Sequence, residues 1–157
     1  MYRKDTLSNG IHVVSETLPK VRSVSIGVWV KVGSRHEPDE ISGASHFIEH
    51  MFFKGTKKRT ARDIATEIDS LGGEMNAFTS QESTTYYVKV LDEHLALAIE
   101  ILADILLGSK FDPADMEKER KVILEEIKGV EDTPDDYIHE LFTATVWQGN
   151  ALGRPIL

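Results

Sequence analysis

The order of strand-like and helix-like segments constrains the fold of this chain more than any other feature of its sequence. Apolar residues alternate along 24–33, and two further strand patterns follow at 74–80 and 84–91. Helical spacing marks 93–107 and then continues to residue 147. Because strands come early and in the middle while helices gather late, the sequence predicts an α+β fold. We expect a mixed, mostly antiparallel sheet with helices packed mainly on one face.

Local signals indicate where turns and helices begin. Asn9 and Gly10 lie between two short alternating runs, which is the strongest short-range signal for a hairpin. Three helices are expected to start at a capping residue: Thr60 with Asp63, Asp112 with Pro113, and Thr133 with Pro134. The helix at 93–107 has an apolar stripe that is expected to pack in the core: Leu95, Ala98, Ile99, Leu102 and Leu106.

Composition indicates one globular domain. At 157 residues, with 41% hydrophobic and 28% charged residues, the chain can bury a core and is unlike a disordered protein. Its net charge of −8 argues against nucleic acid or an anionic membrane as the main partner. The basic run at 54–62 is interpreted as a solvated loop and helix start. No stretch approaches the roughly twenty apolar residues that span a bilayer.

Several features that the sequence lacks limit the possible metal ligands and the expected cellular location. Cysteine does not occur, so any metal must be held by histidine or carboxylate side chains. Residues 1–16 contain neither the apolar core of a signal peptide nor an amphipathic transit segment, and a cytoplasmic location is therefore expected. The sequence ends on GNALGRPIL without a closing element, and we expect a domain that is truncated at its C-terminal end.

The stretch SHFIEHMFFKG, residues 45–55, places two histidines and a glutamate within an apolar helical pattern. On a helix, His46 and His50 lie one turn apart and project from one face, so both imidazoles can reach a single ion. Glu49 is offset on the same side, where it can hold a metal-bound water without being a ligand. Zinc suits these donors and keeps one position open for water in catalytic sites. The pKa of such a water is about 7, and Glu49 can take its proton as it attacks a carbonyl.

Histidines at this spacing can also be core residues that have hydrogen-bond partners. The three polar groups sit among large apolar residues: Phe47, Ile48, Met51, Phe52 and Phe53. Burying all three groups without partners costs on the order of several kcal/mol. A bound metal ion is therefore the favoured interpretation.

A third ligand is required, and the helix MEKERKVILEEIKG offers candidates for it. Glu119 and Glu126 are seven positions apart and share one face with Ile123, so either carboxylate could turn inward. Glu117 and Glu125 fall on other faces and suit solvent and pairing four residues along the helix.

Four segments together resemble one family of zinc peptidases: GASHFIEHMFFKGT, LGGEMNAFTSQESTTYY, ERKVILEEI and LGRPIL. The H-x-x-E-H order is that of the inverzincin group. The combination resembles the processing-peptidase and pitrilysin family, which includes mitochondrial processing peptidase and insulin-degrading enzyme. The likeness spans almost the whole chain, although Ser45 stands where the family usually has alanine.

The resemblance implies a role for each candidate residue. In the family, the distal zinc glutamate lies 76 positions after the second histidine, which corresponds to residue 126 here. His46, His50 and Glu126 would accordingly bind zinc. Glu49 would be the catalytic general base, and Glu119 would be an auxiliary catalytic carboxylate.

The resemblance also implies a mode of substrate binding. EMNAFTS corresponds to a sheet-edge strand that pairs with the substrate backbone, so Asn76, Ala77 and Phe78 would hold the peptide by strand addition. Family members have a second, similar half that closes over the peptide and supplies an arginine and a tyrosine. That half is absent here, and contact with it or with a second copy of the chain is expected.

The expected function is that of a zinc-dependent endopeptidase acting on extended or unstructured peptides. Residues 1–157 would be its N-terminal catalytic domain, with Zn2+ as cofactor and a peptide or protein substrate as partner. The alternative is a non-catalytic binding or structural subunit, because the family contains members that have lost the zinc motif. A metal-binding regulatory module is a third interpretation, but it would not need Glu49 in the base position.

Overall fold

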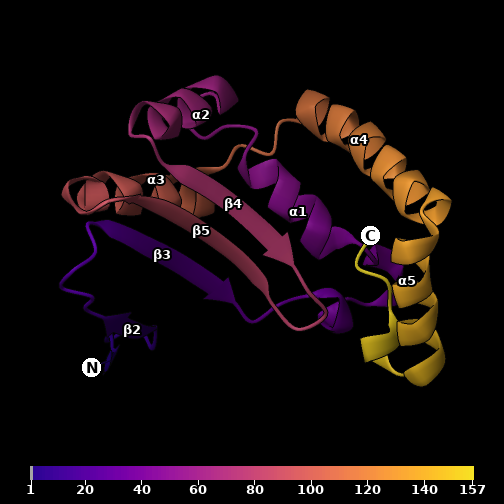
Figure 1. Ribbon diagram of the computed structural model, residues 1–157. Coiled ribbons are helices and arrows are strands. Elements are labelled where there is room, and N and C mark those ends of the chain that lie inside the picture. Colours follow the sequence, from indigo (N-terminus) through magenta and orange to yellow (C-terminus); the bar gives the residue numbers. More distant parts are fainter. Residues whose placement is uncertain (1) are drawn as a thin grey trace.

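The computed structural model describes residues 2–157, and Figure 1 shows the elements coloured along the chain. The strands are β1 (Tyr2–Thr6), β2 (His12–Glu16), β3 (Ser23–Val30), β4 (Glu74–Thr79) and β5 (Thr84–Leu91). The α-helices are α1 (Ala44–Phe52), α2 (Ala61–Ser70), α3 (Leu95–Gly108), α4 (Pro113–Asp132) and α5 (Pro134–Val146). Within residues 2–157, no helix combines the length and the hydropathy that crossing a membrane requires.

Strands β3, β5 and β4 form an antiparallel sheet in that order, which makes β4 an edge strand. Tyr86 on β5 lies opposite Val28 of β3 and Ala77 of β4. Strands β1 and β2 form a separate antiparallel hairpin around Asn9 and Gly10, and Gly10 has a φ of +88°, which favours glycine. The predicted hairpin and the mostly antiparallel pairing are confirmed.

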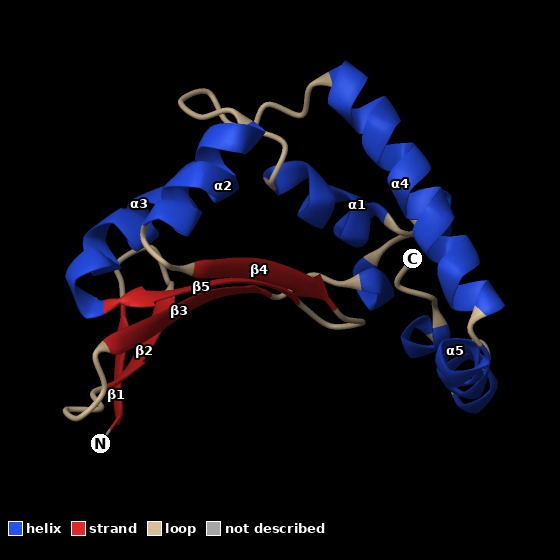
Figure 2. Cartoon of the chain, turned by 45° about the horizontal axis from the view of Figure 1, so that its top comes forward, coloured by secondary structure: helices blue, strands red, loops and turns tan. Residues whose placement is uncertain are grey.

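Figure 2 shows α1, α2 and α3 on one face of the three-stranded sheet. The core lies between the sheet and these helices, with Val88 of β5 and Ile101 and Ile105 of α3 fully buried. Ile64 and Ile68 of α2 also belong to it. Burial of each such side chain contributes roughly 1.5–3 kcal/mol to folding. The predicted α+β class, with helices mainly on one face, is confirmed.

The core stripe predicted for α3 is only partly correct. Leu95 and Ile99 are exposed, Ile99 by 51%. The buried residues of α3 are Ala98, Ile101, Leu102, Asp104 and Ile105. Because LALAIEILADILLG is apolar around most of the helix, its periodicity does not single out the face that meets the sheet.

An apolar groove of about 650 Å³ lies beside these elements. Its walls come mainly from β3, α1 and α3 and include Val28, Val30, Ile48, Ile99 and Leu107. Leu107 is 88% exposed. An apolar surface of this extent is typical of a face that another segment or molecule covers.

All three predicted N-cap positions are confirmed, and in two of them the side chain makes a capping hydrogen bond. Thr60 Oγ1 accepts a hydrogen bond from the Asp63 amide, and the Asp63 carboxylate accepts from the Thr60 amide. Asp112 Oδ1 accepts from the amide of Ala114 at 2.9 Å. Thr133 occupies the N-cap position of α5, but its hydroxyl donates to the carbonyl of Gly129 instead. The predicted start of α5 at Thr133 and Pro134 is therefore confirmed, although the Thr133 hydroxyl does not cap it, because α4 offers that hydroxyl an acceptor one turn earlier.

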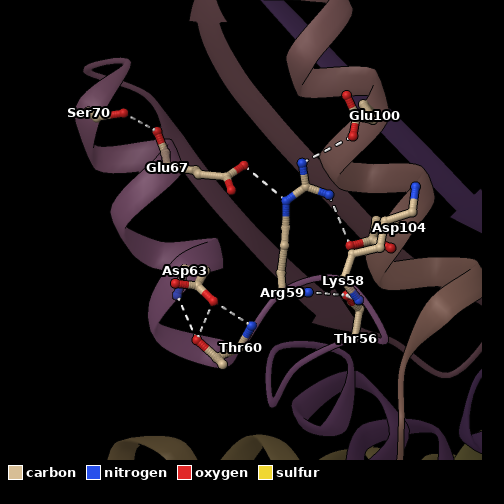
Figure 3. A network of polar contacts seen from close by, with 9 residues as sticks. All are labelled: Thr56, Lys58, Arg59, Thr60, Asp63, Glu67, Ser70, Glu100 and Asp104. Atoms are coloured by element: carbon tan, nitrogen blue, oxygen red, sulfur yellow. Dashed lines mark hydrogen bonds and ion pairs between the residues drawn. The ribbon is translucent and has the colours of Figure 1, made fainter.

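The sequence predicted a solvated loop and helix start at 54–62, but part of this basic run is buried. The guanidinium of Arg59 is largely buried and pairs with Glu67, Glu100 and Asp104 at 2.9, 3.1 and 3.0 Å (Figure 3). Asp104 Oδ2 also accepts a hydrogen bond from Thr56 Oγ1 at 2.7 Å. Burial opposes ionisation of Asp104, but the bonds from Thr56 and Arg59 outweigh it, so the pKa of Asp104 lies below its usual value. This network ties the loop after α1 to α2 and α3.

Candidate metal centre

Helix α1 begins where a buried carboxylate meets its N-terminus. Glu37 Oε2 accepts a hydrogen bond from the Gly43 amide at 2.7 Å, and Oε1 accepts from the Ser45 amide at 2.6 Å. A carboxylate here satisfies amides that lack partners within the helix and complements the helix dipole. Sequence reasoning missed Glu37 because its partners lie six and eight residues away, outside the spacing of a capping box.

The C-terminal segment returns to this end of α1 (Figure 1). Arg154 pairs with Asp39 at 2.7 Å and donates a second bond to the carbonyl of Glu37. Arg154 belongs to the LGRPIL segment, which therefore holds in place the loop that leads into α1, the histidine helix that carries His46 and His50.

His46 and His50 on α1 meet Glu126 on α4. The Nε2 atoms of His46 and His50 lie 3.9 and 3.5 Å from Glu126 Oε2. One donor atom from each of the three residues lies within 4.8 Å of the others. In a tetrahedral zinc site with bonds of about 2.0–2.1 Å, ligand atoms lie about 3.4 Å apart. The three donors thus need only a small closure to share one ion.

Burial and charge suit this group to a metal. The histidine side chains are 12% and 18% exposed, whereas Glu126 is 42% exposed and leaves one side open. Burial lowers the pKa of His46, and His50 lowers it further, against the opposing effect of the Glu49 and Glu126 carboxylates. The neutral imidazole that binds metal is therefore favoured. Two imidazoles and one carboxylate with an open side match the His₂Glu set of catalytic zinc sites.

Glu119 lies behind His50 rather than in the ligand group. Its Oε1 is 3.4 Å from His50 Nδ1, and its Oε2 forms an ion pair with Lys54. Glu119 is buried, with 4% of its surface exposed. The two candidates for the third ligand are thus separated by the structure, since Glu126 faces the Nε2 atoms and Glu119 faces the opposite nitrogen of one ring. Sequence reasoning missed Lys54, which it assigned to the solvated basic run.

Glu117 and Glu125, also on α4, are on the surface, as expected. Glu117 pairs with Arg120 at 2.9 Å and with Lys121 at 4.0 Å. Glu125 pairs with Lys128 at 2.6 Å. Adjacent residues 125 and 126 therefore differ completely in environment, which makes Glu125 a matched control for Glu126.

Glu49 is held by the edge strand. Thr79 Oγ1, at the end of β4, donates a hydrogen bond to Glu49 Oε2. Burial raises the pKa of the nearby Tyr86 hydroxyl, and the Glu49 charge raises it further. Glu49 therefore sits between the histidines and β4, with a neutral phenol in the vicinity. Neither Thr79 nor Tyr86 was expected, because only the pairing of β4 with β5 and their packing on α1 bring them here.

The proposed substrate residues lie along β4, which the sheet leaves as an edge. Asn76 and Phe78 are exposed, and Ala77 between them is half-buried. Asn76 Oδ1 accepts a hydrogen bond from the amide of Ala77 at 2.8 Å. The strand thus presents backbone groups and two exposed side chains next to the residue that anchors Glu49.

Comparison with known proteins extends this picture. Residues 12–157 match the insulinase family, peptidase family M16. The chain is 52% identical over its whole length to the uncharacterized zinc protease YmxG of Bacillus subtilis, of which it covers 38%. Over 99% of the chain it is 46% identical to an Arabidopsis thaliana protein named probable mitochondrial-processing peptidase subunit beta, of which it covers 29%.

A solved structure agrees with the sequence relatives. The crystal structure of a protease from Helicobacter pylori matches 98% of this chain and 37% of its own, with a TM-score of 0.91 and 30% identity. The chain therefore spans between 29% and 38% of the length of these three proteins. The match extends over the histidine helix, the edge strand and α4 alike. The resemblance seen in the sequence is confirmed, and the chain belongs to the insulinase family of zinc proteases, peptidase family M16.

Proposed function

We propose that the protein is a zinc-dependent endopeptidase that cleaves extended or unstructured peptides. The observation that carries the proposal is the convergence of His46, His50 and Glu126 from two helices on one point. These three residues are the proposed zinc ligands. When bound, zinc would polarise the scissile carbonyl and lower the pKa of a water molecule to about 7.

Glu49 is the proposed general base. It takes a proton from the attacking water at its carboxylate and passes it to the nitrogen of the leaving amine as the C–N bond breaks. Its burial and its hydrogen bond from Thr79 Oγ1 support this role, since a base must be held in one orientation. Glu119 acts through His50 and does not touch the reacting atoms.

Strand β4 is the proposed docking site for the peptide. A substrate that adds to this edge gains main-chain hydrogen bonds that do not depend on its sequence, which favours extended and unstructured peptides. Asn76 would release the Ala77 amide as the peptide pairs with Asn76, Ala77 and Phe78. Because the chain spans 38% and 29% of the two relatives from Bacillus subtilis and Arabidopsis thaliana, we also propose that a further region closes over the peptide.

The test combines metal content with cleavage. Zinc should be present at one ion per chain, and an unstructured peptide should be cut by the protein but not by its Glu49→Gln variant. Comparison of the 157-residue chain with the longer relative from Bacillus subtilis would show how much activity the additional region supplies. Failure of the chain to bind micromolar zinc would reject the proposal. Zinc binding without cleavage in either protein would favour the non-catalytic alternative.

A further inference from the structure

We infer that Lys54 is a positioning residue of the metal centre: its ammonium holds Glu119 and, through Glu119, the imidazole of His50. The inference rests on the proposed function, because it concerns one of the proposed ligands. Lys54 lies outside the H-x-x-E-H motif, and the inference adds it to the residues that form the metal centre.

Lys54 stands at the junction of the two helices that form the site. It follows the last residue of α1 by two positions, and its amide donates to the carbonyl of Met51 at 3.1 Å, which continues the turn of the helix end. From there its side chain crosses to α4 and pairs with Glu119 Oε2. Lys54 and His50 thus approach the same carboxylate from the same end of α1.

Because Glu119 is buried, its ion pair with Lys54 is needed to stabilise the charge of its carboxylate. A buried carboxylate is costly unless it is both paired and hydrogen-bonded. Within residues 2–157, its ion pairs are the one with Lys54 and the longer contact with His50 Nδ1 at 3.4 Å. Lys54 is therefore the fully charged partner that allows Glu119 to remain in this position.

The two carboxylate oxygens of Glu119 contact different residues, and this sets the orientation of the His50 ring. With Oε2 held by Lys54, Oε1 is directed at His50 Nδ1, which then carries the ring proton and donates it. The lone pair on Nε2 consequently points toward Glu126, 3.5 Å away. A second carboxylate that fixes the tautomer of a histidine in this manner raises the affinity of the ligand for its metal.

Among residues 2–157, the ion pairs of Glu119 include no other basic residue of this loop. Arg59 is already engaged by three carboxylates. Lys57, three residues farther along the loop, is exposed and forms no ion pair among the described residues. Lys57 is therefore the matched control for Lys54.

The experiment measures zinc affinity by competition with a chromophoric chelator, together with the visible spectrum of the Co2+-loaded protein. We expect Lys54→Met to weaken zinc binding about 10–100-fold, as is usual for loss of an outer carboxylate partner. Lys54→Arg should restore most of the affinity, and Lys57→Met should leave it unchanged. In a Glu119→Gln background, Lys54→Met should have no further effect. Wild-type affinity and an unchanged Co2+ spectrum in Lys54→Met would overturn the inference.

A second measurement needs neither metal nor a variant that folds. Nitrogen-15 NMR of the metal-free wild-type protein reports which ring nitrogen of His50 carries the proton. We expect Nδ1–H in the neutral ring, and a proton on Nε2 would overturn the inference. This result is independent of the proposed function, which fails separately if the wild-type protein binds no zinc.

Discussion

The hydroxyl of Thr79 donates a hydrogen bond to Glu49 Oε2, which joins the last residue of the edge strand to the carboxylate on the histidine helix. Glu49 is 9% exposed, so little water competes for this bond. This hydrogen bond thus links the proposed peptide-docking strand, β4, directly to the proposed general base, Glu49. A peptide that pairs with β4 sits next to a base whose orientation the same strand sets.

Replacing Thr79 by valine should reduce kcat while KM for a peptide and zinc affinity remain nearly unchanged. A hydrogen bond to a charged group contributes about 1.5–3 kcal/mol, which corresponds to a loss of about 10–100-fold in rate. Thr79→Ser keeps the hydroxyl and should retain most of the activity. Steady-state kinetics of both variants provide the check, and a loss in Thr79→Ser as large as that in Thr79→Val would contradict the role assigned to the hydroxyl.

Glu49→Gln should abolish hydrolysis by about 10²–10⁴-fold, because an amide cannot accept the proton of the attacking water. The glutamine oxygen can still accept from Thr79, so the local structure should survive. Zinc content by mass spectrometry should equal that of the wild type. Substantial turnover by this variant would exclude Glu49 as the base.

Glu126→Gln should lower zinc affinity by orders of magnitude, since two imidazoles alone form a poor site. Glu125→Gln, at the neighbouring position on α4, removes only a surface ion pair with Lys128 and should bind zinc normally. Removal of the metal by a chelator should reproduce the Glu126→Gln phenotype in the wild-type protein. Equal affinity in the two variants would argue against Glu126 as a ligand.

Asp104→Asn should destabilise the protein by roughly 3 kcal/mol, the lower end of the range for breaking a buried ion pair, because Arg59 keeps Glu67 and Glu100. The folded-state pKa of Asp104 is lowered, so the unfolded chain binds the proton more readily. The stabilisation is therefore complete above the unfolded pKa, near 4, and is lost as pH falls through the folded pKa.

Urea unfolding measured between pH 3 and 7 would test this pH dependence. The wild-type protein should lose more stability in acid than Asp104→Asn. Asp92→Asn removes an exposed pair with Arg22 and should alter the profile little. Parallel profiles of the wild type and Asp104→Asn would contradict the role assigned to Asp104.

Leu107→Glu should reduce self-association of the 157-residue chain. Leu107 projects into solvent at the rim of the apolar groove, where a charge opposes contact with another molecule. Leu18→Glu, at an exposed leucine outside the groove lining, is the control. Light scattering over a range of concentrations should show a smaller average mass for Leu107→Glu alone. The same mass for both variants would place the association surface elsewhere.

Much of the fold was predictable because its signals are local. The hairpin at Asn9 and Gly10 and the cap at Thr60 depend on residues within a few positions of one another. The pairing of β4 with β5 likewise follows from alternation and a short turn. The face of α3 that packs in the core was not predictable, since Ile99 and Ile101 are equally apolar and only the position of the sheet distinguishes them.

The sequence by itself determined the pair of imidazoles, because residues four apart on a helix share a face in any fold that keeps the helix. It also determined that Glu119 and Glu126 could turn inward together, and the family resemblance selected Glu126 as the ligand. Only the tertiary structure decided that Glu119 faces the far nitrogen of His50, that Lys54 holds it, and that Thr79 holds Glu49. All three pairs of partners are far apart in the sequence, from 30 residues for Thr79 and Glu49 to 69 residues for Glu119 and His50. No local period encodes such contacts; they arise when α4 and β4 pack on α1, and burial then requires each charged group to find a partner.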